Sequence, residues 1–182
     1  MTIIILLTLG LALGMFSSSM LLNVENCFSD KENFKAILVF GIGQGVLLYL
    51  GNLVGNALTY FFTSYEGLIG IIIMVLVAFK MIYESFRIRF KFKVFQIKKN
   101  ADLFLLALAK GFHAFFIGIA SLNLIFPIVN FAFLLIGFSI LFSLLGIQAG
   151  RKWGRFSLAN LAELLGGIFI LISAIIFGFQ YY

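Results

Sequence analysis

The stretch Ile125–Gly150 has the sequence IFPIVNFAFLLIGFSILFSLLGIQAG, without a charged side chain. A helix needs about 20 consecutive apolar residues to cross the hydrocarbon core of a bilayer, so this stretch is predicted to be a transmembrane helix. The chain contains five further apolar runs of sufficient length, at Thr2–Val24, Phe34–Phe62, Gly67–Phe86, Leu103–Leu122 and Phe156–Phe179. The sequence therefore predicts an all-α polytopic membrane protein with six transmembrane helices.

The composition agrees with this fold class. Of the 182 residues, 63% are hydrophobic and 11% are charged, whereas an ordinary soluble domain carries about 25% charged residues. The single cysteine, Cys27, cannot form an internal disulfide. These features exclude a soluble enzyme, a nucleic-acid-binding module and a disulfide-stapled secreted protein. Because no phosphate-binding glycine loop, nucleophile elbow or zinc-ligand spacing occurs, we expect neither enzymatic activity nor a cofactor.

The basic residues predict how the chain is oriented. They concentrate in the loops after the first, third and fifth runs, at Lys31, Lys35, Arg87, Arg89, Lys91, Lys93, Lys98, Lys99, Arg151, Lys152 and Arg155. Short loops rich in Lys and Arg stay in the cytoplasm, so both termini are expected outside a bacterial inner (plasma) membrane. We interpret the basic segment as an anchor on anionic lipid, not a nucleic-acid site. Because the first run lacks a basic leader, we expect it to be a permanent helix.

An internal repeat predicts two halves. At an offset of 95, Leu11-Ala12-Leu13 aligns with Leu106-Ala107-Leu108, and Leu50-Gly51 and Gly55 align with Leu145-Gly146 and Gly150. A three-helix unit has an odd number of spans, so the second copy must be inverted. We expect a first half at 1–86, a basic cytoplasmic loop at 87–102 and a second half at 103–182. Inverted repeats are typical of secondary transporters, whose sites lie near the midplane between the halves.

Three polar residues are candidates for a substrate pathway, because polar groups at membrane depth usually face a bundle interior. Gln44 and His113 each lie about 15 Å inside their runs, at ~1.5 Å per residue, and the repeat pairs Ser18 with His113. Each also has a structural interpretation. His113 could be a neutral imidazole bonded to a neighbouring helix, Gln44 could bridge two helices, and the serine triplet Ser17–Ser19 could pack closely and bond to the backbone.

The charged residues within the runs predict ion pairs. Lys80 and Glu84 are four residues apart, the spacing of an intrahelical pair. Glu163 lies one to two turns inside the last run and needs a partner, for which Lys110 is the available cation. This pair is interpreted as structural, with proton relay through Glu163 as the alternative. Asn52 and Asn56 are expected to form interhelical hydrogen bonds.

Several segments together resemble the MntP-type manganese efflux pumps, which are related to the LysE exporter superfamily. The matching pieces, in order, are Ala12–Met15, Phe40-Gly41 with Gly51 and Gly55, Lys80–Phe86, Leu144–Arg151 and Ala162–Gly167. The resemblance covers nearly the whole chain. It implies six helices in two inverted halves and Mn²⁺ as the transported ion.

The resemblance also implies an altered site. The family pattern has an acid in the first, second and fourth helices. In this chain the first of these positions falls within Phe16–Ser18, with Ser18 preferred because the repeat pairs it with His113, and the other two are Gln44 and His113. Mn²⁺ favours carboxylate and carbonyl oxygens, so the loss of these acids removes charge that would offset cation desolvation. We expect a modified midplane site with His113 and Gln44 as metal ligands. Glu84 and Glu163 fit the family pattern but lie nearer the inner ends of their helices.

Three functional hypotheses follow. The first is a manganese-type divalent-cation efflux transporter, whose partners are the lipid bilayer and the transported cation. The second is a LysE-like exporter of a small organic solute or another ion, in which Lys110 suits an anionic or zwitterionic substrate. The third is a non-transporting membrane component on the same scaffold. The sequence predicts no particular oligomeric state.

Overall fold

The computed structural model describes the whole chain except residues 26–29, 63–65, 93–99, 124–126, 154–155 and 182. Its elements are the helices α1 (Thr2–Glu25), α2 (Asp30–Phe62), α3 (Glu66–Phe92), α4 (Asn100–Ala120), α5 (Ile128–Trp153) and α6 (Phe156–Tyr181), with a short 3₁₀ turn η1 (Ser121–Asn123) after α4. All six long helices are apolar and long enough to cross a membrane. The predicted all-helical, six-span fold is confirmed.

The helix α3 is longer than the apolar run that predicts it. That run ends at Phe86, and α3 continues through Phe92. The added residues contain neither Gly nor Pro, and their Arg and Lys residues have good helix propensity. Basic residues in the last turns of a helix also interact favourably with its dipole. The first part of the basic segment 87–102 is therefore helical.

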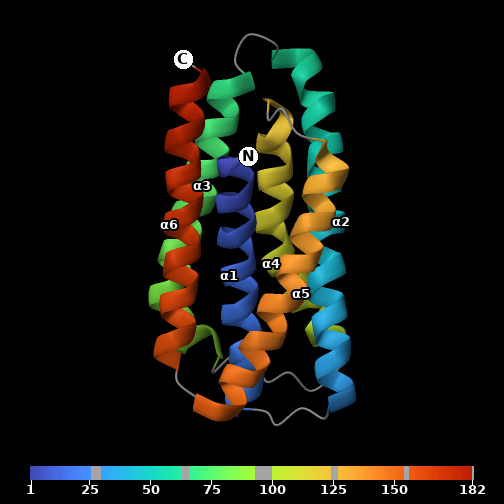
Figure 1. Ribbon diagram of the computed structural model, residues 1–182, viewed down its shortest axis with the longest axis vertical. Coiled ribbons are helices and arrows are strands. Elements are labelled where there is room, and N and C mark those ends of the chain that lie inside the picture. The colour runs from blue at the N-terminus through green and yellow to red at the C-terminus, as the bar shows by residue number, and fades with distance from the viewer. Residues whose placement is uncertain (26–29, 63–65, 93–99, 124–126, 154–155, 182) are drawn as a thin grey trace.

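Helix α1 occupies the middle of the bundle (Figure 1). It packs against α5 and α6, while α2 packs against α4 and α5, and α3 packs against α6 and α4. Buried apolar side chains fill the space between these helices, among them Leu7, Met74, Leu135 and Ile170. Large apolar side chains also cover the outside, including Phe79, Leu76, Phe104 and Phe133. Such an outer surface suits contact with lipid.

Two glycines at repeat-related positions allow close helix contacts. A Cβ atom at Gly51 of α2 would collide with the backbone of α4 at Phe115, and one at Gly146 of α5 would collide with the backbone of α1 at Phe16. Small residues let transmembrane helices approach in this way. Gly51 and Gly146 are paired by the offset of 95, so matched positions make equivalent contacts. The inverted repeat and the division at 1–86, 87–102 and 103–182 stay predictions.

The two chain termini lie toward one end of the bundle (Figure 1). The start of α2 and the end of α5 lie at the opposite end, where Lys31, Lys35, Arg151 and Lys152 are exposed. We call this the basic end. The positive-inside rule predicts the cytoplasmic side of a membrane protein from such a concentration of Lys and Arg at one end.

Candidate transport site

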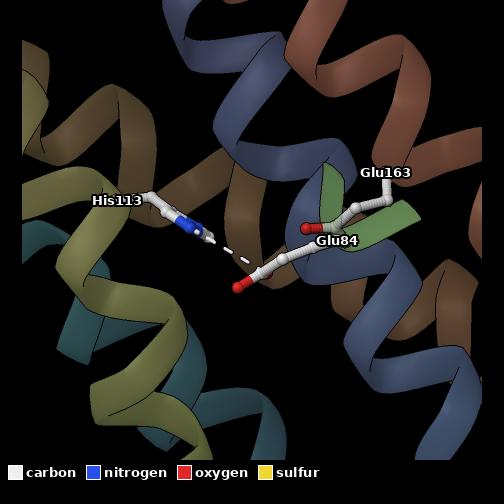
Figure 2. A group of neighbouring side chains, drawn as sticks. All are labelled: Glu84, His113 and Glu163. Atoms are coloured by element: carbon white, nitrogen blue, oxygen red, sulfur yellow. Dashed lines mark ion pairs between the residues drawn. The ribbon is translucent and has the colours of Figure 1, made fainter. Parts of the chain in front are cut away.

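Four ionisable side chains from three helices meet inside the bundle. They are Glu84 on α3, Lys110 and His113 on α4, and Glu163 on α6, and we call them the charged cluster. Lys110 Nζ lies 2.5 Å from Glu163 Oε1 and 3.2 Å from Glu84 Oε2. His113 Nε2 lies 4.0 Å from the same Glu84 oxygen. Figure 2 shows Glu84, His113 and Glu163 converging from their separate helices.

The fold explains how these residues meet. Lys110 and His113 are three residues apart on α4, so they share one helix face. Because α3 packs against both α4 and α6, Glu84 can reach α4 while Glu163 approaches from α6. Helix α1 borders the cluster at Gly14, where an added Cβ would lie 3.9 Å from Glu163 Oε1. The cluster therefore involves helices from the beginning, middle and end of the chain.

The cluster is largely shielded from its surroundings. The side chain of Glu163 is 0% exposed and that of His113 is 3% exposed, whereas Lys110 and Glu84 are 15% and 13% exposed. Moving an isolated charged side chain from water into a protein interior costs on the order of several kcal/mol. Breaking a buried ion pair is strongly destabilising for the same reason. The contacts of Lys110 with both carboxylates therefore allow charged groups to remain within an apolar bundle.

The chemistry of the cluster suits a divalent cation. One nitrogen of His113 and one carboxylate oxygen each of Glu84 and Glu163 lie within 4.8 Å of one another. Carboxylates suit hard ions such as Mn²⁺, and imidazole is a ligand for many divalent metals. Both carboxylates thus supply the negative charge that Ser18, Gln44 and His113 lack. The ammonium of Lys110 lies in contact with both of them.

The other residues predicted for the pathway have different partners. Ser18 donates a hydrogen bond to the Gly14 carbonyl, with its Oγ 3.1 Å from that oxygen. Gln44 Oε1 accepts a hydrogen bond from Ser139 on α5, at 3.1 Å. These contacts match the backbone-bonded and helix-bridging alternatives for the two residues. The structure brings His113, Lys110 and Glu163 together, while the hydrogen bonds of Ser18 and Gln44 lie outside the charged cluster.

The role of Glu84 differs from the sequence-based expectation. Its predicted partner Lys80 is exposed, and Glu84 contacts Lys110 on α4 instead. An exposed pair four residues apart on a helix contributes only about 0.2–0.5 kcal/mol, which is too little to determine where a carboxylate points. The signal that could have found this contact is Lys110 itself, a second cation inside an apolar run with two acids available.

A second polar region lies toward the other end of the bundle. Asn52 donates a hydrogen bond to Ser121 at 3.4 Å, and Asn56 donates one to Asn52 at 3.2 Å. With Ile4, Leu122, Ile128 and Phe131 they line a cavity of about 170 Å³, which we call the amide cavity. Asn52 thereby joins α2 to the end of α4, as expected for an interhelical hydrogen bond.

Six bilayer-length apolar helices packed around buried charges define a multi-pass membrane protein. Over residues 27–179 the chain matches the family described as "Mntp: Putative manganese efflux pump". The chain belongs to this family, which confirms the resemblance found in the sequence.

Similar proteins cover nearly the same length. "Putative manganese efflux pump MntP" of Aliarcobacter butzleri is 30% identical over 93% of this chain and 94% of its own. The protein of the same name from Saccharophagus degradans is 33% identical over 94% of both chains. "Putative manganese efflux pump MntP 1" of Wolinella succinogenes is 29% identical over 92% of this chain and 91% of its own. No solved structure matches the chain.

Proposed function

We propose that this chain is a manganese-type efflux transporter that moves a divalent cation, Mn²⁺, out of the cell across the bacterial plasma membrane. The family and the names of the relatives support transport rather than enzymatic activity. The observation that carries the proposal is the charged cluster, in which two carboxylates and an imidazole converge inside an apolar bundle. Ionisable residues at such depth usually mark ion pathways.

The ligands we propose differ in part from those expected from the sequence. Glu84, Glu163 and His113 form the cation site, since together they combine negative charge with a nitrogen ligand. Gln44 and Ser18 remain candidates for lining the pathway away from this site. Gln44 is hydrogen-bonded to Ser139, and Ser18 to the Gly14 backbone. A passing cation could replace these neutral hydrogen bonds with contacts between itself and the side-chain oxygens.

The orientation that we propose sets the order in which an exported cation would meet the two polar regions. We propose that the basic end lies in the cytoplasm and both termini lie outside, according to the positive-inside rule. Glu84 is two residues from the end of its apolar span, Gly67–Phe86, and so lies toward the basic end. Cytoplasmic Mn²⁺ would meet the charged cluster first. The amide cavity, toward the opposite end, would be reached later.

The structure favours a cation over an anionic or zwitterionic solute. The alternative substrate depended on Lys110 as a positive group within the membrane. The ammonium of Lys110 contacts two carboxylates, so its charge is already compensated. The carboxylates outnumber it, and their excess negative charge attracts a cation.

Metal export from cells tests this proposal. The chain is expressed in cells that lack their own exporter, the cells are challenged with Mn²⁺, and intracellular manganese is measured. The wild-type chain should lower intracellular manganese, and Glu84→Gln and Glu163→Gln should remove this effect. Glu32→Gln, the same change at an exposed acid of α2, is the matched control and should export normally. Unchanged intracellular manganese, despite good membrane expression of the wild type, would contradict the proposal.

A further inference from the structure

The ammonium of Lys110 lies where a cation bridging the two carboxylates would lie. Its Nζ contacts one oxygen of Glu84 and one of Glu163, which come from different helices. His113 Nε2 approaches the same oxygen of Glu84. A lysine ammonium is a compact point charge on a flexible stem, and it can donate three hydrogen bonds. Its charge and donor number allow it to occupy the position of a small metal ion.

The ammonium does not use all the ligand capacity around it. Among the described residues, Glu163 Oε2 and Ser17 Oγ are buried and form no hydrogen bond of good geometry, although the Ser17 hydroxyl lies near the Glu163 carboxylate. The Ser17 side chain is 1% exposed and that of Glu163 is 0% exposed. Leaving a buried oxygen without a partner is unfavourable. These atoms are oxygen ligands that a bound metal ion would satisfy.

With a neutral imidazole at His113, the charges in the cluster do not balance, because Glu84 and Glu163 carry two negative charges and Lys110 carries one positive charge. A divalent cation would match the two carboxylates alone. The ammonium and a divalent cation would repel each other if both lay between the same carboxylates, because like charges repel strongly at a few ångströms in a medium of low dielectric constant.

We propose that Lys110 is a tethered cation, which occupies the divalent-cation position between Glu84 and Glu163 and must move aside before a metal ion binds there. The Lys110 side chain is 15% exposed, more than that of Glu163, and its flexible stem allows the ammonium to leave the carboxylates. When the metal ion leaves, the ammonium returns and prevents the carboxylates from remaining as unpaired buried charges. The inference rests on the proposed function for the identity of the ion, but it concerns binding affinity and is measured without transport.

Mn²⁺ binding to the purified protein in detergent tests this competition. Lys110→Met removes the competing charge and keeps an unbranched side chain of similar length. Its Kd for Mn²⁺, measured by titration calorimetry, should be at least about tenfold lower than that of the wild type, the change expected from about 1.4 kcal/mol. Lys80→Met, the same substitution at an exposed lysine one turn from Glu84, should leave the Kd unchanged.

Two further variants distinguish competition from a general change in the protein. In the double variant K110M/E163Q the carboxylate excess is reduced, so the gain in affinity should disappear. Lys110→Gln removes the charge and keeps a hydrogen-bond donor, and it should also bind Mn²⁺ more tightly than the wild type. Thermal unfolding supplies a second measurement, since a ligand that binds only the folded state raises Tm. Mn²⁺ should raise the Tm of Lys110→Met more than that of the wild type.

The outcomes separate this inference from the proposed function. In one outcome, cells that express the wild-type chain export Mn²⁺, but Lys110→Met and Lys110→Gln bind it no more tightly than the wild type. The inference that Lys110 is a tethered cation is then wrong, and the proposed function stands. If the variants bind Mn²⁺ more tightly but the wild type does not export it, the tethered cation stands and the function fails. Failure of both variants to fold, even when they are purified in Mn²⁺, contradicts the inference, because Mn²⁺ should stabilise a site freed for it.

Discussion

The charged cluster and the amide cavity differ in how their buried polar side chains are satisfied inside the same bundle. In the charged cluster, the ammonium of Lys110 is in direct contact with two carboxylates. In the amide cavity, Asn52, Asn56 and Ser121 form a chain of neutral hydrogen bonds beside about 170 Å³ of space. Charges buried in an apolar medium require close partners of opposite sign, whereas neutral amides can satisfy one another beside open space.

The difference indicates separate roles for the two ends. Of these two regions, the charged cluster has the negative charge in excess of its own cation, so we propose that a divalent ion is selected there. The amide cavity has uncharged oxygens, and we propose that an ion passes them without being held tightly. Variants in each region test whether these roles are separate.

The largest expected effect comes from changing Glu163. Glu163→Gln leaves Lys110 with Glu84 as its remaining carboxylate and removes the closest contact in the cluster. Disrupting a buried ion pair costs about 3–5 kcal/mol, so Tm in detergent should fall clearly. Glu32→Gln, at an exposed acid at the start of α2, should lower Tm much less. An unaltered Tm in Glu163→Gln would mean that the pair does not stabilise the fold.

A smaller effect on stability, with a large effect on transport, is expected for His113. His113→Ala removes the nitrogen ligand, and its contact with Glu84 is long, at 4.0 Å. Mn²⁺ export should drop roughly tenfold or more, while Tm should fall less than in Glu163→Gln, because the Lys110 contacts remain. The measurements are manganese content of cells and thermal unfolding. Normal export by His113→Ala would remove this residue from the site.

The amide cavity should show the reverse pattern. Asn52→Ala removes the hydrogen bonds to Ser121 and from Asn56, each of which contributes about 0.5–1.5 kcal/mol. Tm should fall modestly, and the Kd for Mn²⁺ should remain that of the wild type, since no member of the charged cluster is altered. A several-fold change in Kd would show that the two regions are not separate.

The smallest effect is expected for the hydrogen bond between Gln44 and Ser139. A double-mutant cycle with Gln44→Ala and Ser139→Ala should give a coupling energy of about 0.6 kcal/mol, the average for interhelical hydrogen bonds in membranes. If Gln44 only bridges helices, Ser139→Ala should reduce export as much as Gln44→Ala. Greater loss of export in Gln44→Ala would restore Gln44 to the pathway.

The sequence predicts the six spans because hydrophobicity along the chain is itself the physical requirement for crossing a bilayer. The end of α3 is missed for the same reason. Hydrophobicity stops at Phe86, but the helix continues to Phe92, because helix propensity and the helix dipole do not depend on apolar side chains.

Side-chain partners are harder to predict than spans. The sequence identifies Lys110 and Glu163 as buried charges that need each other, since a membrane interior leaves few options. It pairs Glu84 with Lys80 because spacing along one helix can be read from the chain. The contact of Glu84 with Lys110 depends on which helices adjoin α3 and how each is rotated, and neither is visible in a single run of residues.

The most direct test of the cluster as the cation site is Mn²⁺ uptake into proteoliposomes containing the purified protein. The wild type should accumulate Mn²⁺ down its gradient, and E84Q/E163Q should not, although both proteins are inserted in equal amounts. Transport by E84Q/E163Q at the wild-type rate would contradict the assignment of Glu84 and Glu163 to the transport site.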